Sequence, residues 1–212
     1  MSREMHSSDV RVLVASAPEL SSAMKDQIYA LLESNMRAMY ETYSEWNAVE
    51  KRTELEDPVS RFLLVVPKSY DARTTRRTTR HSATTVPPLL GYVMWRYETY
   101  DALAHDSVAV PGEDQMEVAY CYELQVAASY RRLKLGSWLL CLLEAVAWQA
   151  GMRKVMLTVF KQNVDARAFY TKCSYRLDAT SPTDDPSDEY RCVIMSKASP
   201  TLLSQQRVAA PH

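Results

Sequence analysis

The chain has 212 residues, a net charge of −1 and a hydrophobic fraction of 47%, which is the composition of an ordinary globular protein with room for one core. This charge disfavours a nonspecific nucleic-acid binder, which normally carries a strong basic excess. No apolar run reaches the roughly 18 residues of a membrane span, and the first ten residues lack an apolar signal core. We therefore expect a cytoplasmic and nuclear protein.

The four cysteines, Cys121, Cys141, Cys173 and Cys192, show no CxxC spacing, and no histidine lies near any of them in the sequence. This spacing predicts reduced, mostly buried thiols and no metal site.

The first half of the chain predicts strands at residues 10–15, 61–67 and 89–97 and helices at residues 18–43 and 46–56. Ser16 or Ser22 is the expected cap of the first helix. The charged residues of the second helix, Glu50, Lys51, Arg52, Glu54 and Glu56, are predicted to form a solvated face. Residues 68–88 are rich in threonine and arginine without apolar periodicity, which predicts an inserted loop.

The second half predicts strands at residues 116–126, 154–160, 174–179 and 190–196 and helices at residues 135–150 and 163–172. Asn163 or Asp165 should cap the last helix, and Gly151 should end the longer one. The apolar stripe of the longer helix is Leu135, Trp138, Leu139, Leu142, Leu143, Val146, Ala147 and Ala150. The order of elements predicts an α/β (α+β) domain over residues 1–199, with a mixed sheet of about seven strands and about four helices, and a flexible tail at residues 200–212.

The sequence from Arg131 to Gly136 joins a predicted strand to the start of a long predicted helix, and it contains three cations and one glycine. The first N–H groups of a helix have no partner inside the helix, and the helix dipole favours negative charge there. This turn is therefore predicted to bind an anion, such as the diphosphate of a cofactor.

The strand before this turn carries chemistry of its own. Alternation puts Tyr120 and Tyr122 on one face and Glu123 on the other. Glu123 is a candidate general base, acting directly or through one water, and a phenol could orient the substrate or donate a proton. Each residue alone also fits a plain structural role, a glutamate at the surface or a tyrosine in the core with its hydroxyl in water.

The turn Arg131-Arg-Leu-Lys-Leu-Gly136 and the order of elements resemble the acetyl-CoA site of the GNAT superfamily of N-acetyltransferases, whose pattern there is Arg/Gln-x-x-Gly-x-Gly/Ala. The segment from Asn163 to Tyr170 resembles a later motif of the same superfamily. The segments 35–36, 40–41, 50–52, 120–123 and 154–161 are similar to the branch of the superfamily that acetylates histone N-termini. This similarity runs from about residue 35 to residue 196 and implies the GNAT fold.

The resemblance implies acetyl-CoA as co-substrate and assigns roles to individual residues. The cofactor-binding residues would be Leu124, Gln125, Val126, Arg132, Leu133, Lys134, Leu135, Gly136, Ser137 and Asn163. The catalytic residues would be Glu123, as base through water, together with Tyr122 and Tyr120. The substrate-binding residues would be Tyr40, Trp46, Glu98, Asp101, Tyr122, Thr158, Ser181 and Tyr190. Glu98, with either Tyr100 or Asp101, would receive an arginine at the third position of the substrate, and Tyr170 is a candidate general acid.

The function implied is acetyl transfer from acetyl-CoA to the N-terminal α-amine of histone H4 and histone 2A, whose tails begin Ser-Gly-Arg-Gly, without an acyl-enzyme. A monomer is expected, free of nucleic acid and membrane, with co-translational action at the ribosome as one setting. Two alternatives stay open: a lysine or small-amine acetyltransferase of the same fold, and a non-catalytic module that binds acetyl-CoA or peptide.

One position departs from the family pattern, because Lys134 stands where the pattern has its first glycine. Glycine lets the backbone approach phosphate and relaxes φ. Lysine can serve there if its φ is negative and its side chain points outward.

Overall fold

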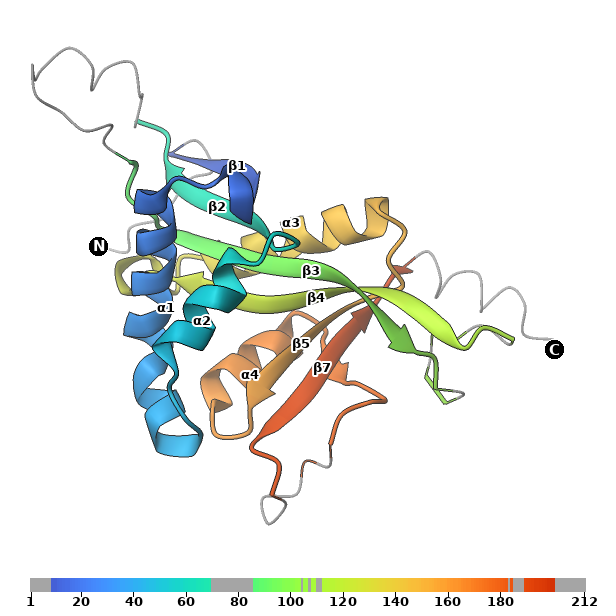
Figure 1. Cartoon of the computed structure of the whole chain (residues 1–212). Helices are drawn as coiled ribbons and strands as arrows, with labels where there is room; N and C mark the ends of the chain where they lie inside the picture. The colour runs from blue at the N-terminus through green and yellow to red at the C-terminus, as the bar shows by residue number, and fades with distance from the viewer. Residues whose placement is uncertain are drawn as a thin grey trace, which may run out of the picture. The chain divides into compact units, whose positions relative to one another are not determined.

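The computed structural model describes residues 9–69, 86–103, 105–106, 108–109, 112–182, 184 and 189–200 (Figure 1). Most of the predicted loop at 68–88 and nearly all of the predicted tail at 200–212 lie outside these residues.

The elements follow the predicted order. The strands are β1 (Val10–Ser16), β2 (Arg61–Pro67), β3 (Gly91–Asp101), β4 (Gln115–Val126), β5 (Lys154–Phe160), β6 (Arg176–Leu177) and β7 (Cys192–Ala198). The helices are α1 (Ser22–Tyr43), α2 (Ala48–Glu56), α3 (Leu135–Gln149) and α4 (Val164–Lys172), with short 3-10 helices at Ala17–Glu19 and Ala128–Tyr130. None of the helices in the described ranges has the length and hydrophobicity that crossing a membrane requires.

The strands form one sheet in the order β1-β2-β3-β4-β5-β7-β6. β4 and β5 are parallel, whereas β1 with β2, β5 with β7, and β6 with β7 are antiparallel. The parallel pair is joined through α3, the strand–helix–strand crossover that the sequence predicts. The predicted mixed sheet with four helices is confirmed.

Helices α1 and α2 begin a few residues later than predicted, because their caps are Ser21 and Asn47. Ser21 has an extended backbone, and its hydroxyl accepts the N–H of Met24, so α1 begins at Ser22 rather than near residue 18. Asn47 accepts the N–H groups of Val49 and Glu50 and starts α2. Asn163 caps α4, as predicted.

The buried stripe of α3 is rotated relative to the predicted one, since Ala150 is exposed and Trp138, Leu142 and Val146 are only half-buried. Its buried residues are Leu135, Leu139, Leu140, Leu143, Glu144 and Ala147. Glu144 can be buried because its carboxylate accepts a bond of 2.7 Å from the Lys197 ammonium. Gly151 ends the helix with φ 80° and places the Met152 N–H 3.0 Å from the carbonyl oxygen of Ala147.

The four cysteines are free thiols. The prediction of mostly buried thiols is right for Cys121 and wrong for Cys141, which lies on the exposed side of α3.

The chain groups into two compact units, the first comprising residues up to Met94 and Glu123–Leu140, the second Trp95–Tyr122 and the residues from Cys141 onward. In the first, α1 and α2 lie side by side and pack against β2, whose residues from Phe62 to Val66 are buried (Figure 1). In the second, β5 pairs with β7 along its whole length, and Val155 to Leu157 are buried. Glu123 and the basic turn therefore belong to the first unit, and Tyr120 and Tyr122 to the second.

Candidate active site

Glu123 lies inside the first unit, with only 7% of its surface exposed. It therefore does not fit the plain reading of a strand glutamate at the surface. Burial in a medium of low polarity disfavours the carboxylate form, and the pKa of Glu123 is raised to about 7. At neutral pH this side chain is poised between its two protonation states, which is the property of a general base.

Two side chains counteract the burial of Glu123. The ammonium of Lys51 lies 4.0 Å from one carboxylate oxygen, and the amide of Gln125 donates to the other at 2.8 Å. Lys51 also pairs with Glu54 at 2.8 Å. Burial lowers the pKa of Lys51, but the nearby carboxylates of Glu123 and Glu54 outweigh it and raise the pKa overall, so Lys51 is charged at neutral pH. The predicted solvated face of α2 is therefore wrong for Lys51 and Glu54, whose side chains are only 16% and 25% exposed.

A chain of hydrogen bonds connects Glu123 to the basic turn. The Asn35 amide donates to the Gln125 side-chain oxygen at 2.9 Å and to the Val126 carbonyl at 3.2 Å. The Arg131 guanidinium donates to the Asn35 oxygen and, at 3.2 Å, to the same Val126 carbonyl. The base and the predicted anion site are thus tied together by polar side chains from α1 and β4.

Two residues predicted to bind substrate meet beside Lys51. The rings of Tyr40 and Trp46 lie edge to face with their centroids 5.6 Å apart, and the Lys51 ammonium lies 4.8 Å from the Tyr40 ring centroid. Burial, then the charge of Glu123, raises the pKa of the Tyr40 phenol, so it is neutral at physiological pH. This corner of the first unit joins a base, a cation and two aromatic rings.

The basic turn does not meet the condition set for its lysine, because Lys134 has φ 63° rather than a negative φ, and Arg132 has the same value. Two residues with side chains thus hold the left-handed conformation that glycine adopts most readily. The side chains of Arg132 and Lys134 are exposed.

The backbone after this turn fits a diphosphate. The first bond of α3 runs from the Trp138 N–H to the Lys134 carbonyl, so the N–H groups of residues 135–137 precede the helical ladder. Leu135 is 1% exposed, so its side chain belongs to the core and only its backbone can serve a ligand. Leu124, Val126, Leu133, Gly136 and Ser137 are half-buried. The predicted anion site therefore keeps its donors and its positive charge.

In the second unit the predicted tyrosines form one group. The hydroxyl groups of Tyr120 and Thr158 share a hydrogen bond, and the Tyr100 ring stacks on the Tyr120 ring at 5.8 Å. Tyr122 lies 5.2 Å from Tyr120, and its hydroxyl donates to Glu98 at 3.0 Å. Burial is the main reason that the pKa values of Tyr120 and Tyr100 are raised, so both phenols are neutral at physiological pH.

The other residues of the second unit that were predicted to belong to the site make separate contacts. Glu98 and Tyr100 share a face of β3 by alternation, whereas Asp101 has the opposite parity and is exposed. Tyr100, rather than Asp101, thus accompanies Glu98. The Ser181 hydroxyl accepts the Ile194 N–H at 3.0 Å and donates to the Pro182 carbonyl at 2.9 Å. Tyr190 is 54% exposed, and the side chain of Asn163 serves as the cap of α4.

Two features of the site are missed by sequence reasoning, the pairing of Lys51 with Glu123 and the Asn35 link to Arg131. The only sequence signal for them is that Asn35 and Lys51 lie in segments that resemble the family. The predicted general acid Tyr170 packs against Phe169 and Tyr175, with ring centroids 5.1 and 5.9 Å away.

Similar solved structures share this fold. The NatC complex bound to Gag peptide and CoA matches with 10% identity over 90% of this chain and 98% of that chain, at a TM-score of 0.56. Arabidopsis thaliana Naa50 in complex with the bisubstrate analogue CoA-Ac-MVNAL matches with 17% identity over 88% and 98%, at 0.51. The PaiA N-acetyltransferase from Thermoplasma acidophilum in complex with coenzyme A matches with 16% identity over 89% and 99%, at 0.52.

At such low sequence identities, these likenesses concern the fold alone. The family to which the chain belongs is shown by a separate comparison. Residues 26–175 match the Acetyltransferase (GNAT) family. This range includes α1 from residue 26 onward, the buried Glu123, the basic turn and α4. The chain therefore belongs to the GNAT family and is an acetyltransferase that uses acetyl-CoA as its co-substrate.

Proposed function

We propose that this enzyme is an N-terminal α-amino acetyltransferase that acts on the tails of histone H4 and histone 2A, which begin Ser-Gly-Arg-Gly. The observation that carries the proposal is Glu123, a buried carboxylate with a pKa of about 7 that lies 4.0 Å from the Lys51 ammonium. The fold also accommodates a CoA-linked peptide in one similar protein, Arabidopsis thaliana Naa50, which was solved with CoA-Ac-MVNAL.

The pKa of Glu123 matches an α-amine better than a lysine. A peptide α-amine has a pKa of about 7.7–8.0, so moving its proton to a base with a pKa of about 7 costs roughly 1.4 kcal/mol. A lysine side chain, with a pKa of about 10.4, would require roughly 4.6 kcal/mol for the same transfer. The lower pKa of the α-amine therefore makes an N-terminus easier for Glu123 to deprotonate than an ordinary lysine.

The histone tail is proposed from residue identities and from the tyrosine group. The segments around Asn35, Lys51, Tyr120 and Lys154 resemble the histone N-terminal acetyltransferase NatD. Glu98 supplies a carboxylate for the arginine at the third position of the tail, and the hydroxyl of Tyr122 orients that carboxylate through its bond of 3.0 Å. Arginine and carboxylate form strong charge-assisted hydrogen bonds.

In the proposed reaction the co-substrate supplies an activated acetyl group as a thioester. Glu123 accepts the proton of the incoming amine through one water, while Gln125 and Lys51 hold its carboxylate in place. The N–H groups at the start of α3 and the cations Arg132 and Lys134 bind the diphosphate. The amine attacks the thioester carbon directly, the C–S bond breaks, and CoA leaves as a thiolate that takes up a proton, so no residue of the chain carries the acetyl group.

We further propose that the enzyme works as a monomer in the cytoplasm and nucleus, with the ribosome as one place where it meets new histone N-termini. Nucleic acid and membrane are not needed, because the substrate is an extended peptide end.

The test of this function is tandem mass spectrometry of an H4 tail peptide incubated with acetyl-CoA and enzyme. We expect acetate on the α-amine and none on the lysines of the same peptide. A peptide with a blocked N-terminus is the control and should stay unmodified. Acetate on lysine side chains alone would replace the proposal with a lysine acetyltransferase. Calorimetric binding of acetyl-CoA without product from any peptide would favour the non-catalytic module.

A further inference from the structure

Helix α2 brings two opposite charges to the buried base. Lys51 and Glu54, one helical turn apart, are only partly exposed and are paired at 2.8 Å. The Lys51 ammonium lies 4.0 Å from Glu123, so one cation serves two carboxylates. Because the base lies on β4 and the pair lies on α2, the position of this helix decides how strongly the base feels a positive charge.

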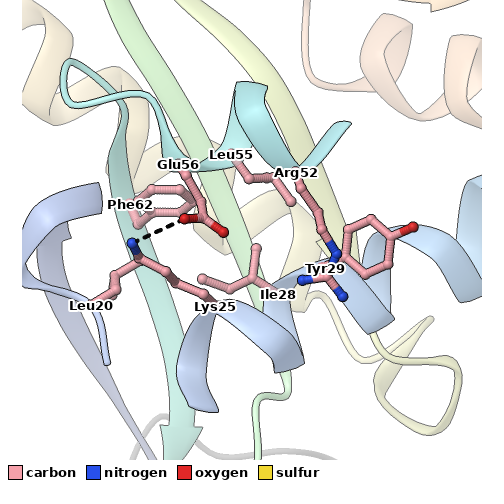
Figure 2. A pocket seen from close by; sticks show the side chains of 8 residues that line it. All are labelled: Leu20, Lys25, Ile28, Tyr29, Arg52, Leu55, Glu56 and Phe62. Carbon is pink, nitrogen blue, oxygen red and sulfur yellow. Dashed lines mark hydrogen bonds and ion pairs between the residues drawn. The ribbon is translucent and has the colours of Figure 1, made fainter. Parts of the chain in front are cut away.

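The opposite side of α2 fixes the helix to α1. Figure 2 shows the Arg52 guanidinium beside the Tyr29 ring, at 3.9 Å from its centroid, and Lys25 facing Glu56 at 3.4 Å. Leu55 fills the space between them and is 5% exposed. The remaining cavity is about 10 Å³, too small for more than one water. These contacts anchor α2 without touching Glu123, so Lys51 and Glu54 are presented from a fixed support.

The charges around Glu123 act in opposite directions. Burial favours the acid form, whereas the Lys51 ammonium and the Gln125 hydrogen bond favour the carboxylate. Glu54 acts against the carboxylate, both through its own charge and by binding the Lys51 ammonium. Tyr40 on α1 is another titratable group beside this pair, and its raised pKa keeps it neutral. Burial is therefore the largest influence on the protonation of the base, and the competition between Lys51 and Glu54 on one face of α2 adjusts it.

We propose that Lys51 is a positioning residue that holds Glu123 in its carboxylate form, and that Glu54 limits this effect by competing for the same ammonium group. The effect of Lys51 and Glu54 on catalysis rests on the proposed role of Glu123 as the base. Their electrostatic effect on the ionisation of Glu123 does not. Replacing Lys51 by a neutral residue should make Glu123 harder to ionise, whereas replacing Glu54 should make it easier.

The coupling is tested without substrate, by NMR titration of the enzyme carrying isotope-labelled glutamate carboxyl groups. The Glu123 signal is identified by its loss in Glu123→Gln. In the wild type its midpoint should lie near pH 7. In Lys51→Met the midpoint should rise by about one unit or more, and in Glu54→Gln it should fall. Lys51→Arg keeps the charge and should restore the wild-type midpoint. Lys172→Met is the matched control, because it removes an exposed lysine of α4 in the second unit and leaves the contacts of α2 intact.

If Lys51 and Glu54 had a merely structural role, both α2 variants would fold less stably, but the Glu123 midpoints would not shift in opposite directions. That result would overturn the proposal. The low-pH limb of kcat/KM supplies the catalytic readout, since the substrate amine is the same for every variant. In Lys51→Met the rate at pH 7 should fall about fivefold or more and recover at higher pH. An unchanged limb in Lys51→Met, beside an inactive Glu123→Gln, would refute this inference alone. Full activity of Glu123→Gln would instead refute the proposed function and leave the NMR shifts to decide the coupling.

Discussion

Lys134 holds a backbone conformation that residues with a side chain usually avoid. Its φ of 63° lies in the left-handed region, and Arg132 two residues earlier has φ 63° as well. A left-handed conformation costs a non-glycine residue about 1–2 kcal/mol. The turn therefore keeps the shape that presents the first N–H groups of α3, and the lysine adds positive charge at the expense of local stability.

At this position we expect Lys134→Gly to stabilise the protein by about 1 kcal/mol relative to Lys134→Ala, because only glycine adopts positive φ without steric cost. Both variants remove the same charge, so their difference isolates the backbone. Urea denaturation of the two proteins measures it. If the alanine variant were as stable as the glycine variant, the turn would not hold the strained conformation.

The residues of the site differ in how far the sequence could predict them. The sequence was enough to propose Glu123 as a candidate base, because this residue precedes a basic turn and a helix start in one short segment. Its burial was not predictable, since strand alternation alone does not tell which faces of a central strand are covered. Lys51 was misread as solvated, because a charged run on a short helix normally faces water and the contact to β4 is long-range.

At the scale of elements, continuous apolar runs gave the most accurate predictions. β2 and β5 have the predicted bounds, because both are short runs of mostly branched apolar residues with clear ends. Helix starts and helix faces were less predictable. α1 begins several residues later than predicted, since Ser21 is its N-cap. The buried stripe of α3 is rotated, because the ion pair with Lys197 makes burial of Glu144 favourable.

β5 also begins with a buried ion cluster that supports the second unit. Lys154 is 2% exposed and contacts Asp106 at 2.5 Å and Asp178 at 2.7 Å. Burial alone would raise the pKa of Asp178, but hydrogen bonds from Lys154, Ser196 and Thr180 outweigh it and lower the pKa. The stabilisation that this carboxylate provides is therefore present above the ordinary aspartate pKa and is lost as the pH falls below it.

We predict that Lys154→Met destabilises the protein by about 3–5 kcal/mol at pH 7, because it leaves two buried carboxylates without their cation. Denaturation by urea at pH 7 and at pH 4 checks the origin of the loss, which should be smaller in acid, where the carboxylates can be protonated. A loss that does not depend on pH would point to packing of the lysine stem instead. Lys25→Met, at an exposed pair, is the control and should cost little.

At the scale of the whole chain, the order of elements and the family were predictable, and the substrate was not. β3 and β4 each run through both compact units, and the chain passes from one to the other between Tyr122 and Glu123. Local periodicity predicts such strands, but not which tertiary contacts each half makes. The net charge of −1 does not by itself select a basic tail, so the proposed recognition of such a tail rests on single residues such as Glu98.

We predict that Glu123 removes the proton of an α-amine. The kcat of Glu123→Gln at saturating Ser-Gly-Arg-Gly peptide and acetyl-CoA tests this role most directly. Glutamine keeps the size of the side chain and cannot take the proton, so kcat should fall about 100-fold or more, as expected for loss of a general base. Acetyl-CoA affinity, measured by calorimetry on the same samples, should stay within about twofold, since the diphosphate-binding turn is untouched. A variant that turns over at the wild-type rate would contradict the account.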